Sequence, residues 1–136
     1  MSSDFTIGIK LTPSAFNNVV LADNTTVHEF FKITNSSQLR IRMDSSGNQA
    51  NLDLDSGTFG DDYLVITRVS DVLTLWQNGV VQTGTTPTLS GTTDIDAIGV
   101  RRTDLNAYAG DIKEIQIYST SSAALTANVN DRLSTL

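Results

Sequence analysis

The sequence has no cysteine, only two prolines, only two glutamates and no long hydrophobic run. The absence of cysteine excludes a disulfide framework, thiolate chemistry and a cysteine-bound zinc ion. No stretch approaches the roughly 18 consecutive apolar residues of a membrane span, so we expect no membrane partner. The polar start MSSDF also lacks the basic and apolar segments of a secretory signal, and none is expected.

Positive charge is scarce as well. The chain has 9 Lys and Arg against 15 Asp and Glu, a net charge of −6, and its lysines are Lys10, Lys32 and Lys113. Phosphate backbones are bound by clustered Lys and Arg, so nucleic acid is excluded as a partner. The 136 residues, with 39% hydrophobic and 18% charged side chains, predict one globular domain over residues 1–136.

The residue types that are abundant favour strands and turns. There are 18 Thr, 14 Ser, 13 Asp and 10 Asn, counted over the whole chain. Apolar and polar residues alternate with period 2 in nine or ten short segments, which predicts a two-sheet antiparallel sandwich. Strands are expected at residues 5–11, 19–22, 27–33, 39–43, 50–54, 63–69, 72–76, 80–81, 95–100 and 112–118.

Local features refine this prediction. Asn78-Gly79 between apolar segments predicts a tight hairpin, and simple alternation places Phe30 and Phe31 on opposite faces of their strand. A helical spacing of Leu residues and Val129 predicts a turn or two of helix at the end of the chain, capped by Thr126. The expected core comprises Phe5, Ile7, Ile9, Ile66, Leu75, Ile98, Ile115 and Ile117.

Three stretches carry a resemblance to a known family. Gly110–Tyr118 followed by Ala124-Leu125-Thr126 resembles the ending of laminin G-like domains in the concanavalin A-like lectin/glucanase superfamily. The segments 73–79 and 5–13 are similar to that family's Asn-Gly hairpin and early strand. The resemblance implies an all-β jelly-roll sandwich. Family members usually have a strand before the one at 5–13, and its absence would leave the strand at 110–118 with an open edge.

Candidate catalytic groups are sparse. Asp53 and Asp55 share a strand face, but the usual alternation makes this a solvated outer face. Glu29 and Glu114 are far apart in the sequence, and His28 is the only histidine. Glycosidases need two convergent carboxylates and a serine nucleophile needs a base, so we expect no enzyme and assign no catalytic residue.

Acidic loops and aromatic side chains are the candidate ligand sites of this sequence. The resemblance implies calcium at a rim of the sandwich, and the loop acids that could contribute are Asp61, Asp62, Asp94, Asp96, Asp104 and Asp111. Asp is also the turn residue of this chain, so no cofactor is assigned and calcium is left open. Sugar sites need aromatic faces. Trp76 and Tyr108 are expected to pack structurally, while Phe16 and Phe59 are loop aromatics without a polar cluster beside them.

Two functions remain. The small, acidic, Thr-rich sandwich resembles the surface proteins of tailed-phage virions, which predicts a non-enzymatic structural protein (head decoration, cement or fibre-associated) at the virion surface. Its partners would be other protein subunits. The alternative is a carbohydrate-binding, lectin-like module with a glycan partner, cytoplasmic or extracellular, its calcium dependence left open. For assembly, the short polar segment Met1, Ser2, Ser3 and Asp4 is the expected interface to a neighbouring subunit.

Overall fold

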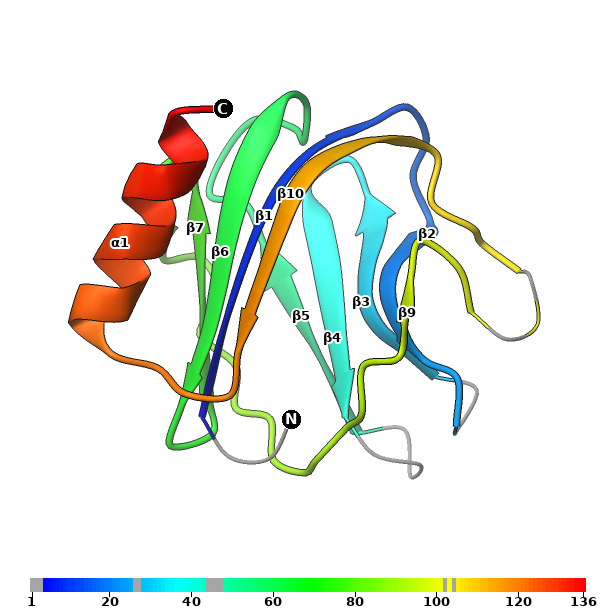
Figure 1. Ribbon diagram of the computed structural model, residues 1–136, viewed down its shortest axis with the longest axis horizontal. Helices are drawn as coiled ribbons and strands as arrows, with labels where there is room; N and C mark the ends of the chain where they lie inside the picture. The colour runs from blue at the N-terminus through cyan, green and yellow to red at the C-terminus, as the bar shows by residue number, and fades with distance from the viewer. Residues whose placement is uncertain (1–3, 26–27, 44–47, 102, 104) are drawn as a thin grey trace.

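Two five-stranded antiparallel sheets face each other, and one helix covers part of the outer face of one sheet (Figure 1). The computed structural model describes residues 4–25, 28–43, 48–101, 103 and 105–136, without the side chain of residue 28. Sheet A has the order β10 (Gly110–Tyr118), β1 (Phe5–Pro13), β6 (Asp62–Val69), β7 (Val72–Gln77) and β8 (Val80–Gln82). Sheet B has the order β5 (Asn48–Asp53), β4 (Gln38–Met43), β3 (His28–Asn35), β2 (Asn18–Asp23) and β9 (Ala97–Ile98).

The predicted all-β jelly-roll sandwich is confirmed, and each predicted strand has a counterpart. The strand expected at 95–100 shortens to the two residues of β9, and residue 27 lies outside the described residues. Asn78 and Gly79 both have positive φ angles, of 52° and 80°, as the predicted hairpin between β7 and β8 requires.

The core lies between the two sheets. Phe5, Ile7, Ile9, Ile66 and Leu75 are fully buried, as predicted. Ile115 is only half-buried, and the prediction is wrong for Ile98 and Ile117, whose exposed fractions are 61% and 41%. The reason is their place in the sheets: β9 and β10 are end strands, so each has a hydrogen-bonded neighbour on one side only among the described strands. Alternation in the sequence predicts which face of a strand points inward. It does not predict whether the strand lies at the centre or at the end of its sheet.

A β-bulge in β3 overturns the expected placement of the two adjacent phenylalanines. Leu21 pairs with Phe31 while the next residue, Ala22, pairs with Glu29, so Phe30 is an extra residue of β3 at this point. A second irregularity, between Val19 and Leu21, leaves an extra residue on β2. Phe30 and Phe31 are therefore both fully buried, and Phe30 packs edge-on against Phe5 with ring centroids 5.9 Å apart. The same bulge turns Glu29 and Lys32, three residues apart, to one outer face.

The C-terminal helix α1 (Ala123–Ser134) begins earlier and runs longer than predicted. Its N-cap is Ser122, whose Oγ accepts a hydrogen bond from the Leu125 backbone N–H at 3.1 Å. Thr126 lies inside the helix, and its hydroxyl donates to the Ser122 carbonyl instead of capping. Val129 and Leu133 pack on Val65 of β6, on the outer face of sheet A. In the described part of the chain, no helix has the length and apolar character to cross a membrane.

Candidate functional site

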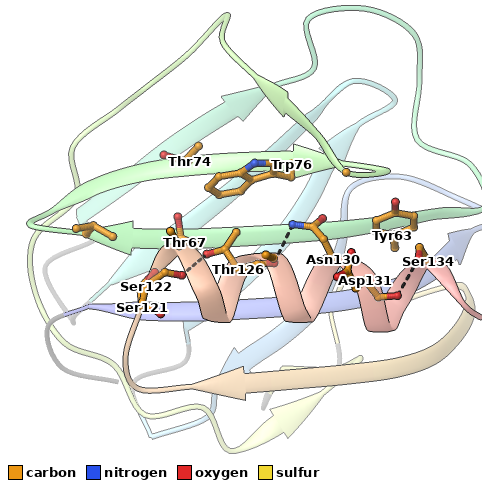
Figure 2. Close-up of a pocket in the computed structure, with 14 residues that line it drawn as sticks. Tyr63, Thr67, Thr74, Trp76, Ser121, Ser122, Thr126, Asn130, Asp131 and Ser134 are labelled. Carbon is orange, nitrogen blue, oxygen red and sulfur yellow. Dashed lines mark hydrogen bonds between the residues drawn. The ribbon is translucent and has the colours of Figure 1, made fainter.

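A groove with a volume of about 680 Å³ runs between α1 and the outer face of β6 and β7 (Figure 2). Strand alternation brings Tyr63, Thr67 and Val69 of β6 to this face, and Thr74 and Trp76 of β7 lie beside them in register. The helix packs over β1 and β6, so the outer face of β7 stays open. The residues that line the groove are Tyr63, Thr67, Val69, Thr74, Trp76, Gly79, Ser121, Ser122, Ala123, Thr126, Ala127, Asn130, Asp131 and Ser134.

Two aromatic side chains give the groove its apolar surface. Trp76 and Tyr63 are half-buried and pack against the cluster of Val65, Val129 and Leu133, which fixes one side of each ring. Figure 2 shows the Trp76 ring along the sheet side of the groove, with Tyr63 further along β6. An indole held in this way is a rigid, amphipathic surface on which an apolar face of a ligand can stack.

Polar groups on α1 face the aromatic side across the groove. Asn130 Nδ2 donates to the Thr126 carbonyl at 3.0 Å, which orients its amide, while Asn130 Oδ1 is buried without a partner. Ser134 Oγ donates to the Asp131 carbonyl at 2.8 Å (Figure 2). The Asp131 carboxylate and the Thr74 hydroxyl have no hydrogen-bond partner among the described residues, and Asp131 is exposed while Thr74 is half-buried. They are therefore available to a ligand, whereas Thr67 is buried.

This arrangement is suited to binding rather than to hydrolysis. Of the described residues that line the groove, Asp131 is the only acid. Glycoside hydrolysis uses two carboxyl groups that face each other about 5–9.5 Å apart. An aromatic face, several hydroxyls, an amide and one carboxylate can instead orient a polyhydroxylated ligand by stacking and hydrogen bonds.

The carboxylates considered from the sequence lie elsewhere and have separate structural partners. Asp53 accepts a hydrogen bond from Gln38 Nε2 at 2.8 Å. Asp55 accepts from the Thr83 and Gly84 backbone N–H groups, and these bonds hold the pKa of Asp55 below its usual range. Asp55 therefore closes the loop after β8 as an ionised acceptor.

The remaining candidates for acid–base chemistry are similarly engaged. Glu114 of β10 forms a bidentate pair with Arg132 of α1, with Arg132 to Glu114 distances of 2.6 and 3.1 Å. Glu29 lies on the outer face of sheet B, among cations and away from the groove. His28 belongs to β3, and its side chain lies outside the described part of the structure.

The loop acids considered for calcium do not converge. Asp61 binds Lys10 and Thr12, and Asp62 binds the Gly60 backbone N–H, so both are used within the fold. Asp96 accepts from the Asn24 backbone N–H across the β2–β9 end. Asp94 lies in the loop before β9, Asp111 lies in β10 opposite Thr12 of β1, and Asp104 lies outside the described residues. The described residues bring together no group of three His, Cys, Asp or Glu side chains that could hold a metal ion, and calcium stays a prediction.

The aromatic residues considered from the sequence differ in whether they pack as predicted. Tyr108 packs against the core as expected, and its burial raises the pKa of its hydroxyl to about 12. Phe16 and Phe59, expected as loop aromatics, both lie in loops, but Phe59 is buried in the core whereas Phe16 is exposed. Trp76 packs on the sheet face as expected but also lines the groove. The alternation of Thr74 with Trp76 marks this face in the sequence, whereas the position of α1 over it is a property of the packed structure.

The predicted assembly segment is described only in part. Met1, Ser2 and Ser3 lie outside the described residues. Asp4 accepts a hydrogen bond from the Ser70 backbone N–H at 2.8 Å, which ties it to the turn between β6 and β7. The open edge expected at the C-terminal strand is present, because β10 ends sheet A and pairs with β1 alone among the described strands. The interface itself stays a prediction.

Comparison with known proteins identifies the fold. No protein-family model matches the sequence, and no curated protein matches it. A structural match is the native heptameric SAP-like pentraxin from Limulus polyphemus, with a TM-score of 0.64 and 11% sequence identity. The match covers 98% of this chain and 69% of the pentraxin chain. At this identity the likeness shows the fold alone, a jelly-roll sandwich like that of the pentraxin. The laminin G-like resemblance stays a prediction.

Proposed function

We propose that this protein is a non-catalytic saccharide-binding protein whose site is the groove between α1 and the outer face of β6 and β7. The observation that carries this proposal is the half-buried Trp76 ring along one side of the groove, with Asn130 and Asp131 on the other. A pyranose ring has apolar C–H faces and a polar rim of hydroxyls. Trp76 would stack on an apolar C–H face of the sugar, and the helix side chains would form hydrogen bonds with its hydroxyls.

Two further features support this proposal. The groove is bordered by regular elements, a strand pair and a capped helix, so its aromatic and polar groups are fixed before a ligand arrives. Its single described acid provides an acceptor for sugar hydroxyls without the second carboxylate of a hydrolase. The jelly-roll sandwich, which resembles that of a pentraxin, is compatible with this activity.

A glycan array probed with the fluorescently labelled protein tests the proposal. We expect selective binding to one class of saccharide, and we expect Trp76→Ala to weaken that binding about 30-fold, the usual effect of removing a central aromatic. Phe16→Ala is the matched control, since Phe16 is an exposed aromatic that does not line the groove. Repeating the titration with EDTA tests calcium dependence. A blank array, or equal weakening by the two variants, would refute the groove as the site.

We infer a second candidate function, assembly with other subunits, from the open edge of sheet A. β10 ends the sheet, and its Ile117 side chain is 41% exposed although its strand position faces inward with Ile7. An edge of this kind can accept a strand from a neighbouring subunit through main-chain hydrogen bonds. The structural role at a virion surface, predicted from the sequence, would use this edge.

Light scattering after size-exclusion chromatography tests self-assembly. We expect the mass of the wild-type protein to rise with concentration, and Ile117→Lys to return it to the monomer mass. Val80→Lys is the control, since Val80 is 63% exposed on β8, at the other edge of the same sheet. Deleting residues 1–4 tests the N-terminal contribution. A wild-type protein that is monomeric at every concentration would contradict self-assembly.

A further inference from the structure

The outer face of sheet B concentrates positive charge in a chain whose net charge is −6. Lys32 of β3, Arg40 and Arg42 of β4, and Arg101 after β9 account for four of the nine Lys and Arg residues. Lys32, Arg42 and Arg101 surround Glu29, with nitrogen to carboxylate oxygen distances of 3.6, 3.8 and 3.2 Å. We call these four cations the basic cluster. It lies on the sheet opposite to the one that carries the groove.

The cluster has more positive charge than its described partners neutralise. The side chains of Lys32, Arg42 and Arg101 are 8%, 22% and 18% exposed, and Glu29 is the one described carboxylate that pairs with them. Partly buried cations in excess over anions are unfavourable, because each has lost hydration without gaining a full counter-charge. A bound anion would restore the balance.

Two further observations point to an anion at the same place. Lys32 and Arg40 lie directly opposite each other in the β3–β4 register, and like charges in that position repel. The Nε atoms of Arg42 and Arg101 are buried without a hydrogen-bond partner. Buried donors are normally satisfied, so each of these N–H groups lacks an acceptor that an oxyanion could supply.

The cluster is also held in position. Arg40 Nε donates to Asn51 Oδ1 at 3.2 Å, and Arg42 Nη2 donates to Gln49 Oε1 at 2.8 Å, each across the β4–β5 register. Asn51 and Gln49 are neutral, so they orient the guanidinium groups without cancelling their charge. Fixed guanidinium groups bind sulfate, phosphate and carboxylate oxygens well because their N–H groups match the spacing of these oxygens.

We propose that the basic cluster of Lys32, Arg40, Arg42 and Arg101 is a binding site for an oxyanion, a sulfate or phosphate group. The β3 bulge creates the site, because it turns Glu29 and Lys32 to the same face as Arg42. The group is either a free ion or an ester on a larger ligand, since the chemistry recognised is the same. The site is independent of the saccharide groove on sheet A.

Nuclear magnetic resonance of the wild-type protein tests this directly. The probe is sodium sulfate, titrated against sodium chloride at equal ionic strength, with inorganic phosphate as a second probe. We expect saturable shifts of the Arg42 and Arg101 Nε–H signals, with little change elsewhere. Shifts that do not saturate, or that chloride reproduces, would overturn the proposal. This measurement needs no substitution, so it does not depend on how a variant folds.

Variants then localise the effect. Arg42→Gln and Arg101→Gln together are expected to weaken sulfate binding at least about tenfold, the result of losing charge-assisted hydrogen bonds. Lys113→Gln, which removes an exposed cation on β10, is the matched control and should bind as the wild type does. Equal binding by the double variant would refute the site. Dextran sulfate compared with neutral dextran distinguishes an ester on a polymer from the free ion, and sulfate should leave Trp76 fluorescence unchanged.

Discussion

Gly8 of β1 lies directly beneath Val129 of α1, and a Cβ atom at Gly8 would overlap Cγ1 of Val129. Gly8 is in register with Val65 of β6, which is in turn in register with Trp76 of β7. The absence of a side chain at Gly8 therefore lets α1 seat closely on the sheet. Because α1 forms one wall of the groove, this contact also sets the position of that wall relative to Trp76.

Replacing Gly8 tests this relationship. We expect Gly8→Ala to lower the free energy of unfolding in urea by about 1–3 kcal/mol, the usual cost of overpacking, and to weaken saccharide binding as the helix is displaced. Gly60→Ala is the control, since a Cβ atom at Gly60 would meet nothing within 4 Å. Equal stability of the two variants would show that α1 does not depend on close contact at Gly8.

The pair of Glu114 and Arg132 predicts a pH dependence for the docking of α1. The hydrogen bonds from Arg132, and then that from Gln116, hold the pKa of Glu114 below its usual range. A carboxylate with a lowered pKa in the folded state stabilises that state above its unfolded pKa of about 4.3. This stabilisation is lost as the pH falls from there through the lowered folded pKa.

Thermal unfolding of the wild type and of Glu114→Gln measures this contribution. We expect the wild type to have the higher Tm at pH 6, and the difference to shrink as the pH falls from about 5 to about 3. Ser134→Ala, a change on the same helix that removes no ionisable group, is the control and should show no such convergence. A difference in Tm between wild type and Glu114→Gln that is constant across this range would contradict the assignment.

Among the described residues, Arg68 is the largest fully buried side chain, and its role is structural. Its Nη1 donates to the Leu89 and Gly91 carbonyls at 3.0 Å each, and its guanidinium lies 5.3 Å from the centre of the Phe5 ring. We expect Arg68→Met to lower the free energy of unfolding by about 2–4 kcal/mol, since it leaves buried carbonyls without their donor. Chemical denaturation measures this, with Lys113→Met as an exposed control expected to change stability by less than about 0.5 kcal/mol.

Much of the fold could be predicted from the sequence because the strands alternate regularly. Leu39 and Ile41 in β4 are buried at every second position, and Ile7 and Ile9 in β1 face the core as their alternation predicts. Alternation failed where the backbone departs from it: the bulge that buries both Phe30 and Phe31 depends on how β2 and β3 pair, which no local pattern encodes.

The sites were less accessible to prediction because each depends on contacts between distant segments. Trp76 was correctly expected to pack on a sheet face, but the groove exists only because α1 stops short of β7. The helix start at Ser122 was missed because Ser122 and Thr126 are both good caps, and the backbone conformation decides between them. The basic cluster likewise depends on the bulge in β3 and on the contact between Arg101, far along the chain, and Glu29 of β3.

The fluorescence of Trp76 tests the central claim most directly, because this chain has one tryptophan and it lines the groove. A saccharide selected on the array is titrated into the wild-type protein while the emission spectrum is recorded. We predict a saturable shift of the emission to shorter wavelength, with the same midpoint as binding measured by calorimetry, since stacking removes water from the indole. Calorimetric binding of that saccharide with an unchanged Trp76 spectrum would contradict the account.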